Sequence, residues 1–551
     1  MVENAATADP QLQQIRSYSR SAATADQKRQ LLKTEQKRFQ PRFKYIRNEK
    51  TFVPVAFQND FSTLPLSLIY SYDDPNEQLD VLEKLFNKCL ERHAPMKRVK
   101  VTRPPAPWLT TEDFQSLLAE RDRLRKKAHT PHSTPNDWAA FRNIRNSIKI
   151  RVREATKNFV KKALSSNKSK EIWRVIHRIL KPSPKPLRFD PDSLNEYFIN
   201  TGHRVMGSTS DSTDDLLNYI DTLTTNNKED GFRLRNVSRD EVYHVIKNLR
   251  SDCSTGPDKI PAKYIKLVAD ILAGPLTKII NGSIDLTMFP EAWKISRISP
   301  IPKNETPMKD EDLRPIAILP VLSKIYEKIV TIQMVHFLET NKILDERIVG
   351  YRKGHSTTTA LLKIRDDIIR AMKEGELTLM VMADYSKAFD TVNFKTVLRK
   401  MHHLGFSNNF MKWTANYLSN RRQFVQIDDH QSKPAVTHFG VPQGSILEPI
   451  IFNIYVSDLK KSIMSRIQYA DDTSLYSHCH VKNLPDCLYS ISANLANLNA
   501  WSSQSNLALN PKKTEAMLFS TSQMASVHSL QSLGELDLSL NISGNTLKRV
   551  N

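Results

Sequence analysis

Two adjacent aspartates, Asp471 and Asp472, stand at the centre of a short β-rich stretch that constrains how the chain folds. β-Forming residues flank the pair, Ile467-Gln-Tyr on one side and Leu475-Tyr on the other. This pattern predicts a strand, a tight turn and a second strand, with both carboxylates at the tip. Adjacent carboxylates repel each other unless water or a cation separates them. Alone, the pair predicts a solvated turn; a metal site requires a third carboxylate nearby.

A third carboxylate follows another strand signal. Residues 376–383 form an apolar run of a length that fits a buried strand, and Asp384 comes directly after it, where the chain turns toward a helix. A carboxylate at the end of a buried strand is costly unless it is paired or ligated. If this strand lies beside the Asp471-Asp472 hairpin, the three aspartates form a site able to hold two divalent ions about 3.5–4 Å apart.

A glycine-containing loop lies between these two features. Residues 439–447 read Phe-Gly-Val-Pro-Gln-Gly-Ser-Ile-Leu and lead into a predicted helix. Gly440 and Gly444 allow a backbone to approach a ligand closely. Gln443, between them, is therefore a candidate contact for a nucleotide.

The charge of the chain indicates a polyanionic partner. The formal net charge is +21, and residues 91–190 hold 25 Lys and Arg against 9 Asp and Glu. A phosphate backbone fits such a basic block best, with a membrane surface as the second choice. Apolar residues at positions 141, 144, 148, 152, 155 and 159 predict one stripe of a long helix. The other faces carry candidate phosphate contacts, namely Arg142, Arg145, Lys149 and Arg153; a merely solvated charged helix is the alternative.

Cysteine usage and hydropathy set further limits. The four cysteines form no CxxC pair, which excludes a disulfide scaffold and fits a reducing compartment. His478-Cys479-His480 with Cys487 is a poor zinc site, because alternate residues of a strand point to opposite faces. No apolar run approaches the roughly 18 residues of a transmembrane helix, and the N-terminus lacks a signal-peptide core. We therefore expect an intracellular protein, soluble or held on nucleic acid, with no membrane partner.

Five motifs in a fixed order give a resemblance to a known family. They are Arg314-Pro-Ile, Ala383-Asp-Tyr-Ser-Lys-Ala-Phe-Asp390, Gly440-Val-Pro-Gln-Gly-Ser445, Tyr469-Ala-Asp-Asp472 and Asn506-Leu-Ala-Leu-Asn-Pro-Lys-Lys-Thr514. Each motif is weak by itself. Together they resemble reverse transcriptases of non-LTR retrotransposons, closest to the jockey-like group, from about residue 238 onward.

The resemblance implies an α+β fold, a right-hand polymerase with fingers and an antiparallel palm sheet backed by helices. It also implies an RNA-directed DNA polymerase that extends a DNA primer on an RNA template with deoxynucleoside triphosphates, using two Mg²⁺ ions, with Mn²⁺ as an alternative. A ribonucleoprotein in nucleus and cytoplasm is expected for such an element. The implied domains are an N-terminal segment (1–104), a basic helical linker (105–186), an N-terminal extension of the fingers (187–284) and the reverse transcriptase domain (285–551).

The resemblance also implies residue roles. Asp384 and Asp471 match the principal metal ligands, with Asp472 as the less certain third. Phe389 matches the ring that excludes a 2′-hydroxyl. The remaining matches are Lys303 and Arg314 for the triphosphate, Gln443 with Gly444 near the incoming nucleotide, and Lys513 as the late lysine that protonates pyrophosphate, with Lys512 left open.

Structural roles are the alternatives for individual residues. Asp390 is expected to cap the following helix rather than to bind metal. Taken alone, Phe389 reads as core, and Lys303 and Arg314 read as surface or turn residues. Glu448 stands where the family usually has glycine, which predicts crowding of the turn that presents Gln443.

The ends of the chain lead to further expectations. The sequence stops soon after Lys513, where relatives continue into a thumb, and residues 1–100 do not match the family's endonuclease. We therefore expect a fragment with weak primer–template binding and poor processivity. A catalytically impaired nucleic-acid-binding remnant is the alternative function. A viral-type RNA-templated RNA polymerase is disfavoured by Ala470 and by the bulk of Phe389.

Overall fold

The computed structural model describes residues 43–100, 112–165, 187–207, 212–223, 231–463, 466–521, 540–542 and 544–550, with a few positions between 169 and 176. The chain divides into two compact units. The smaller comprises Met1–Ile46 and Arg98–Leu180, and the larger comprises Arg47–Lys97 and Lys181–Asn551. Residues 1–42 of the predicted N-terminal segment and residues 105–111 and 181–186 of the predicted basic linker lie outside the described residues.

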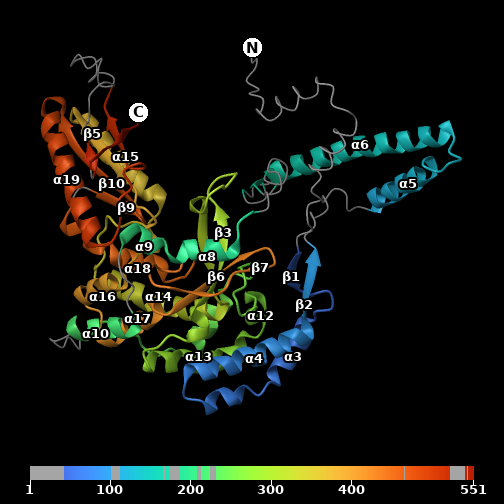
Figure 1. The fold of residues 1–551 in the computed structure, drawn as a ribbon, viewed down its shortest axis with the longest axis horizontal. Coiled ribbons are helices and arrows are strands. Elements are labelled where there is room, and N and C mark those ends of the chain that lie inside the picture. Colours follow the sequence, from blue (N-terminus) through green and yellow to red (C-terminus); the bar gives the residue numbers. More distant parts are fainter. Residues whose placement is uncertain are drawn as a thin grey trace. The chain divides into compact units, whose positions relative to one another are not determined.

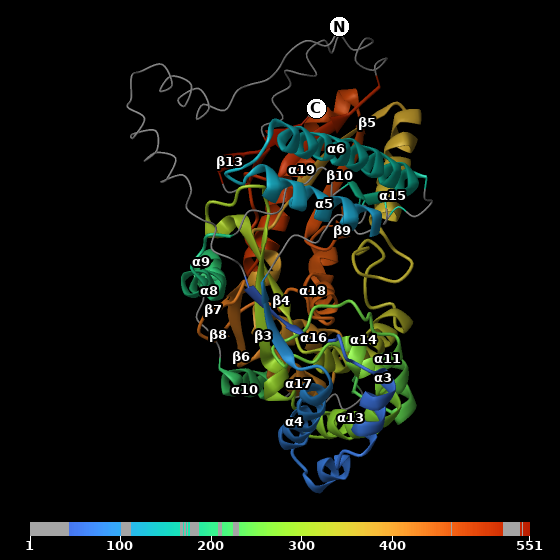
Figure 2. The same cartoon turned by 90° about the vertical axis from the view of Figure 1, so that its right-hand side faces the viewer.

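Two helices form the described core of the smaller unit. α5 (Glu112–Ala128) and α6 (Pro135–Leu164) pack side by side as a helical hairpin (Figure 2). Lys127 Nζ lies 2.9 Å from Asp137 Oδ1 beside the connecting turn. The long helix predicted from the apolar stripe is therefore present, and Ile148 of that stripe is buried. A two-stranded sheet pairs β1 (Phe43–Arg47) with β2 (Met96–Lys100).

The larger unit contains a sheet that we call the C-terminal sheet, with strand order β14-β11-β5-β10-β9. Its strands are β5 (Glu376–Ala383), β9 (Arg466–Tyr469), β10 (Asp472–His480), β11 (Glu515–Phe519) and β14 (Lys548–Arg549). β5 pairs antiparallel with both β10 and β11, and β10 pairs antiparallel with β9. The predicted buried strand and the predicted hairpin are both present, as neighbours.

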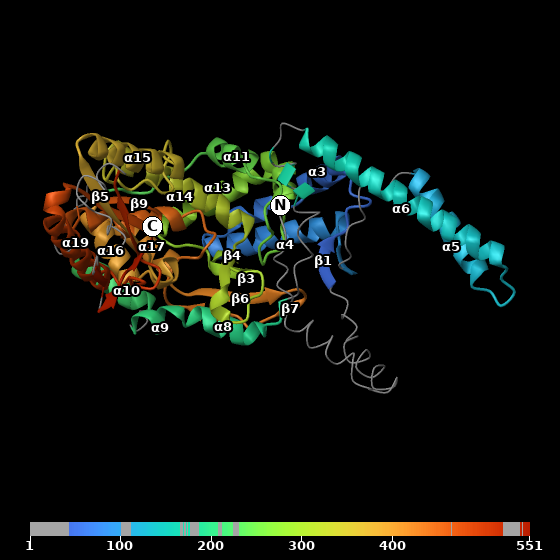
Figure 3. The same cartoon turned by 90° about the horizontal axis from the view of Figure 1, so that it is seen from above.

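Helices cover both faces of the C-terminal sheet, which explains why β5 is apolar along its whole length. Met380 belongs to a cluster with Ile368 of α15 (Thr357–Lys373), whereas Leu379 and Val381 pack into the main core. That core includes Leu495 of α19 (Leu484–Gln504). Because alternate residues of a strand point to opposite faces, α15 and α19 lie on opposite sides of the sheet (Figures 1 and 3).

A second sheet, the central sheet, has the strand order β4-β3-β6-β7, with β8 also paired to β6. Its strands are β3 (Ile295–Pro302), β4 (Leu313–Ile318), β6 (Arg421–Ile427), β7 (His430–Gln431) and β8 (Ala435–Thr437). β3 and β4 form an antiparallel hairpin, and β3 runs parallel to β6. α8 (Pro191–Ile199) packs over β6 and β8. The alternating residues after Trp293 predict a strand, which is present as β3 and is preceded by the 3₁₀ turn η3 (Glu291–Lys294).

The remaining elements of the larger unit are mostly helices around one apolar core (Figure 1). They are α3 (Pro54–Ser62), η1 (Leu66–Ser71), α4 (Pro75–His93), α9 (Thr201–Met206), α10 (Thr213–Leu223), α11 (Arg239–Lys247), α12 (Ala262–Leu267), α13 (Ala269–Asp285), η4 (Asp310–Asp312), α14 (Val321–Thr340), η5 (Ala388–Thr391), α16 (Phe394–His403), α17 (Asn408–Leu418), α18 (Glu448–Tyr455), η6 (Ser457–Lys461) and η7 (Val481–Asn483). A small ribbon joins β12 (Asn541–Ile542) and β13 (Asn545–Thr546).

Apolar residues at helical intervals predict one helix from Tyr70 to Lys97, and the helix in the structure is shorter. Asp74 caps α4 by accepting the backbone N–H of Asn76, and Pro75 occupies its first position. The helix ends at His93, because Pro95 disfavours helical backbone at Ala94. Met96 and Lys97 belong to β2 instead.

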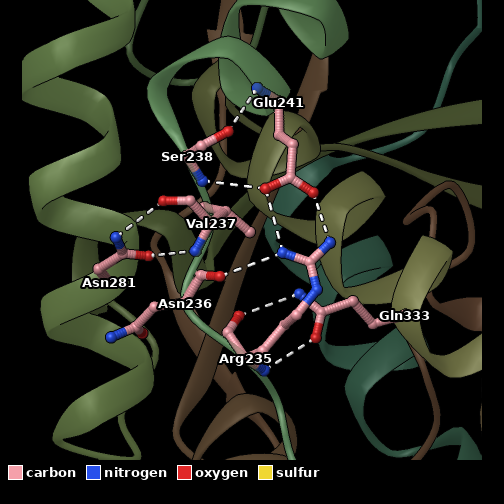
Figure 4. Close-up of polar contacts among 7 residues, drawn as sticks. All are labelled: Arg235, Asn236, Val237, Ser238, Glu241, Asn281 and Gln333. Atoms are coloured by element: carbon pink, nitrogen blue, oxygen red, sulfur yellow. Dashed lines mark hydrogen bonds and ion pairs between the residues drawn. The ribbon is translucent and has the colours of Figure 1, made fainter.

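Side-chain amides hold the extended segment that leads into α11 (Figure 4). Gln333 Oε1 accepts the backbone N–H of Arg235 at 2.9 Å, and Gln333 Nε2 donates to the Arg235 carbonyl at 3.1 Å. Asn281 makes the same pair of bonds with the backbone of Val237. Ser238 then begins the capping box of α11. The segment is thus fixed to α13 and α14 by bonds that satisfy its backbone as a neighbouring strand would.

Candidate active site

The strand register brings the three aspartates to one edge of the C-terminal sheet. Ala383, the last residue of β5, lies opposite Thr473 in β10. Asp384 and Asp472 are the next residues on these antiparallel strands, so they leave the sheet side by side, with Asp471 in the adjoining turn. Ala470 takes the left-handed conformation that the turn requires, with φ 57°. The turn also packs on Gly350, where a Cβ would lie 2.4 Å from the backbone nitrogen of Ala470.

The electrostatics of the aspartates are those of like charges held close together in a partly buried setting. Burial raises the pKa of Asp471, and the charges of Asp472 and Asp384 raise it further, while Arg314 lowers it. Desolvation also raises the pKa of Asp472, with a second contribution from Asp384. The three carboxylates therefore repel one another across the strand pair. Hard oxygen donors gathered in this way fit a divalent cation such as Mg²⁺.

The loop after α19 orients Asp384. The backbone N–H of Asn510 donates to the Asp384 carbonyl at 2.8 Å, and Asn510 Nδ2 lies 3.2 Å from Asp384 Oδ2. Lys513 Nζ lies 3.7 Å from the same carboxylate oxygen. Of the two lysines left open by the sequence, Lys513 is thus the one beside the aspartates. Its side chain remains 71% exposed, which leaves it accessible to a substrate.

Phe389 and Gln443 lie close together because the glycine loop packs on η5. The Phe389 ring is half-buried, with its centroid 4.4 Å from that of Phe452 in α18. Gly440 has a φ of 80°, and a Cβ there would lie 2.8 Å from the Phe389 carbonyl oxygen. Only glycine allows this approach.

The interpretation of Asp390 as a helix cap is wrong. Asn393 caps α16, since its side chain accepts the backbone N–H of Thr396. Asp390 Oδ1 instead accepts a hydrogen bond from Gln443 Nε2 at 2.7 Å. Burial raises the pKa of Asp390 to about 6, against the lowering effects of Lys387, Gln443 and Lys303. Asp390 therefore holds the side chain of Gln443.

Glu448 is accommodated without crowding the turn. Its Oε2 accepts the Gly444 N–H at 2.6 Å, and its own N–H donates to Ser445 Oγ at 2.9 Å. Burial raises the pKa of Glu448 to about 7, with contributions from Asp390, Glu327 and Asp471. The carboxylate thus closes the loop on itself at the start of α18, so the predicted crowding of the turn is wrong.

The basic residues predicted to hold phosphate lie on the β3–β4 hairpin. Lys303 follows β3 and Arg314 is exposed on β4. Lys303 Nζ donates to the Glu311 carbonyl at 2.6 Å. Burial lowers the pKa of Lys303, and so do the charges of Lys387, Lys513 and Arg314. These four cations are therefore near one another. Sequence reasoning missed Lys387, although it lies inside the motif of Asp384.

The other predicted nucleic-acid contacts belong to the smaller unit. Arg142, Arg145, Lys149 and Arg153 are all exposed on α6. Of the residues considered for zinc, His478 Nδ1 lies 2.8 Å from Thr378 Oγ1, whereas Cys479 is buried in the core beneath α19. Among the described helices, none is long and apolar enough to cross a membrane.

Comparison with known proteins shows which families and proteins this chain resembles. Residues 301–535 match the family model described as reverse transcriptase (RNA-dependent DNA polymerase). The matched residues include the three aspartates, the glycine loop and the β4 strand that carries Arg314.

The proteins that this chain resembles come from mobile elements. The chain is 24% identical over 431 residues to "Probable RNA-directed DNA polymerase from transposon BS" of Drosophila melanogaster, covering 73% of this chain and 47% of the relative. It is 23% identical over 450 residues to "RNA-directed DNA polymerase from mobile element jockey" of the same organism, covering 73% and 49%. The chain thus spans about half the length of these relatives. The predicted resemblance to non-LTR retrotransposon reverse transcriptases is confirmed.

Proposed function

We propose that this chain is an RNA-directed DNA polymerase that extends a DNA primer on an RNA template with deoxynucleoside triphosphates. The observation that carries the proposal is the three-carboxylate edge of the C-terminal sheet, within the residues that match the reverse transcriptase family model. The names of the relatives support the same activity. In this reading, the C-terminal sheet is the palm, the β3–β4 hairpin belongs to the fingers, and residues 285–551 form the polymerase domain.

The proposed chemistry is nucleotidyl transfer assisted by divalent metal. Asp384, Asp471 and Asp472 are the proposed ligands. These residues would hold two Mg²⁺ ions, which would supply Lewis-acid activation of the primer 3′-hydroxyl and neutralisation of the triphosphate. Desolvation and mutual repulsion raise the pKa of Asp471 and Asp472, so binding of a cation relieves a strain already present in the folded chain.

The chain's own residues supply position and charge. Lys303 and Arg314 are proposed to hold the triphosphate, the first as a point charge and the second through its bidentate guanidinium. Lys513, 3.7 Å from Asp384, is proposed to donate a proton to the leaving pyrophosphate. Phe389 is proposed to abut the sugar and select deoxynucleotides. Gln443 and Gly444 are proposed to line the nucleotide.

The basic helix α6 is proposed to bind the RNA. Arg142, Arg145, Lys149 and Arg153 extend from one helix into solvent, as side chains that contact a phosphate backbone must. The proposed complex is a ribonucleoprotein with the element's RNA. A non-catalytic nucleic-acid-binding role for the chain is the alternative, and the same basic helix supports it.

Primer extension distinguishes the two functions. The assay uses an RNA template, a DNA primer, deoxynucleotides and Mg²⁺, with the wild-type chain beside Asp471→Asn. We expect incorporation by the wild type and a loss of at least about 100-fold in the variant, because a metal ligand is removed. Asp270→Asn, at a position outside the site, is the control. Equal incorporation by wild type and Asp471→Asn would overturn the metal-site assignment, and no incorporation by either would leave the binding role.

A further inference from the structure

One fully buried carboxylate lies outside the proposed chemistry. Glu327 belongs to α14, and its residue is 0% exposed. Burial raises its pKa, while Arg421 and Lys324 act in the opposite direction. An ionisable group of this kind is retained in a core only when hydrogen bonds compensate its desolvation. Its partners therefore indicate what the group does.

The two carboxylate oxygens of Glu327 accept hydrogen bonds from different elements, one from a helix and one from the glycine loop. Oε1 accepts a hydrogen bond from the Tyr417 hydroxyl of α17 at 3.1 Å. Oε2 accepts the backbone N–H of Ile446 at 2.8 Å. The second bond reaches a residue three positions after Gln443. No other described side chain outside the loop and α18 accepts a backbone N–H from residues 440–447.

Other bonds fix the rest of the loop to its neighbours. The Ala317 N–H of β4 donates to the Gln443 carbonyl at 2.7 Å, and the Gly440 N–H donates to the Val392 carbonyl at 2.9 Å. β4 also carries Arg314, so the strand that bonds to the loop is the one that carries the proposed triphosphate contact. Glu327 ties the far end of the loop to α14, which follows β4 in the chain.

We infer that Glu327 is a positioning residue, whose carboxylate fixes the loop 440–447 so that Gln443 meets the incoming nucleotide. The inference rests on the proposed polymerase function and assigns Glu327 no contact with substrate. A loop released at Ile446 would still be bonded at Gly440 and at Gln443. The expected defect is therefore looser placement of Gln443, which weakens nucleotide binding, rather than loss of the metal site.

Two conservative variants separate the reach of the side chain from its charge. Glu327→Asp keeps the charge but is one methylene shorter, so it loses the bond to Ile446. Glu327→Gln loses the charge but keeps the reach, since its oxygen can accept the Ile446 N–H while its NH₂ donates to the Tyr417 hydroxyl. Tyr326→Phe is the matched control, because it removes a buried hydroxyl next to Glu327 on α14 that accepts its bond from Trp413 Nε1, at 2.8 Å, and not from the loop.

The measurement is steady-state primer extension with the deoxynucleotide varied, alongside thermal unfolding of each variant. We expect Glu327→Asp to raise KM for the nucleotide about 10-fold with a smaller change in kcat. Glu327→Gln should stay within about 3-fold of the wild-type KM, and Tyr326→Phe should lower the melting temperature without raising KM. In a Gln443→Ala background, Glu327→Asp should add less than about 2-fold, because the two residues then act on one contact.

The outcomes discriminate between the two levels of the proposal. An inactive wild-type chain would remove the proposed polymerase function. An active wild type with unchanged KM in Glu327→Asp would overturn the positioning role alone. Equal KM increases in Glu327→Asp, Glu327→Gln and Tyr326→Phe would also overturn it, since a general disturbance of the core predicts that result.

Discussion

Gly444 is the residue whose backbone most directly couples the glycine loop to β4. Its φ is 123°, and a Cβ would lie 2.5 Å from the Ala317 carbonyl oxygen. We therefore expect Gly444→Ala to lower the free energy of unfolding by more than about 2 kcal/mol, from backbone strain and displacement of β4 together. Urea unfolding measures this change.

Gly405 provides the control for that prediction. Its φ is 85°, yet no atom lies within 4 Å of a Cβ built there. Gly405→Ala should cost about 1 kcal/mol, the conformational part alone. Equal costs for both substitutions would contradict the close contact between Gly444 and Ala317.

Single residues were predictable from the sequence where a motif marks them and unpredictable where a distant partner decides their role. The order of motifs sufficed to propose Asp384, Asp471 and Asp472 as one group. Asp390 was misread because a cap was sought among residues near a helix start, and Asn393 is nearer. Glu327 gives no local signal, since its partner Ile446 is 119 positions away.

At the scale of elements, hydrophobic periodicity predicted the strands whose burial follows a regular pattern. β5 is covered on both faces and reads as a continuous apolar run, and β3 alternates because its burial alternates. β6 was missed, because its buried polar residues Arg421 and Gln423 donate hydrogen bonds to partners far away in the sequence, the Trp293 carbonyl and Asn195 Oδ1. The pairing of β11 with β5 was equally invisible, because 135 positions separate the register partners Val381 and Ala516.

The helix α6 carries the prediction that belongs to this scale. If its exposed face binds RNA, replacing Arg142, Arg145, Lys149 and Arg153 by alanine reduces the number of neutralised phosphates. The slope of log K against log salt concentration should then become shallower by up to about 3, at roughly 0.7 per contact with a single strand. Fluorescence anisotropy with a labelled RNA at several salt concentrations measures the slope.

A second quadruple variant tests whether general charge explains the effect. Replacement of four exposed lysines of the larger unit, Lys50, Lys88, Lys328 and Lys342, removes the same formal charge. It should change the slope by less than about 1, because no specific phosphate contacts are lost. An equal change in both variants would contradict a binding role specific to α6.

Over the whole molecule, several carboxyl groups are held in settings that favour their protonated form. Burial raises the pKa of Glu83 to about 8, of Asp258 and Glu448 to about 7, and of Asp390 to about 6. The folded chain thus binds more protons than the unfolded chain above about pH 4. Their contribution to stability is complete below that pH and is lost as pH rises through 6 to 8.

Groups with lowered pKa do not cancel this trend near neutrality. The pKa of Glu241 is lowered to about 2, mainly by its hydrogen bond from Arg235, so its contribution changes only in acid. The pKa of Lys400 is lowered to about 8 by burial, so Lys400 is largely protonated in both folded and unfolded chains below pH 7.5. Among these groups, the buried carboxyls therefore cause most of the change in stability between pH 5.5 and 7.5.

We accordingly expect the melting temperature to fall by roughly 5 °C from pH 5.5 to pH 7.5, which differential scanning calorimetry measures. The double variant Glu83→Gln, Asp258→Asn keeps the size of both side chains but removes their titration, so its profile should be flatter. Glu77→Gln, at an exposed position of the same helix as Glu83, should leave the wild-type slope intact. A double variant that still loses stability as steeply as the wild type would show that the buried carboxyls near α4 do not set the pH dependence.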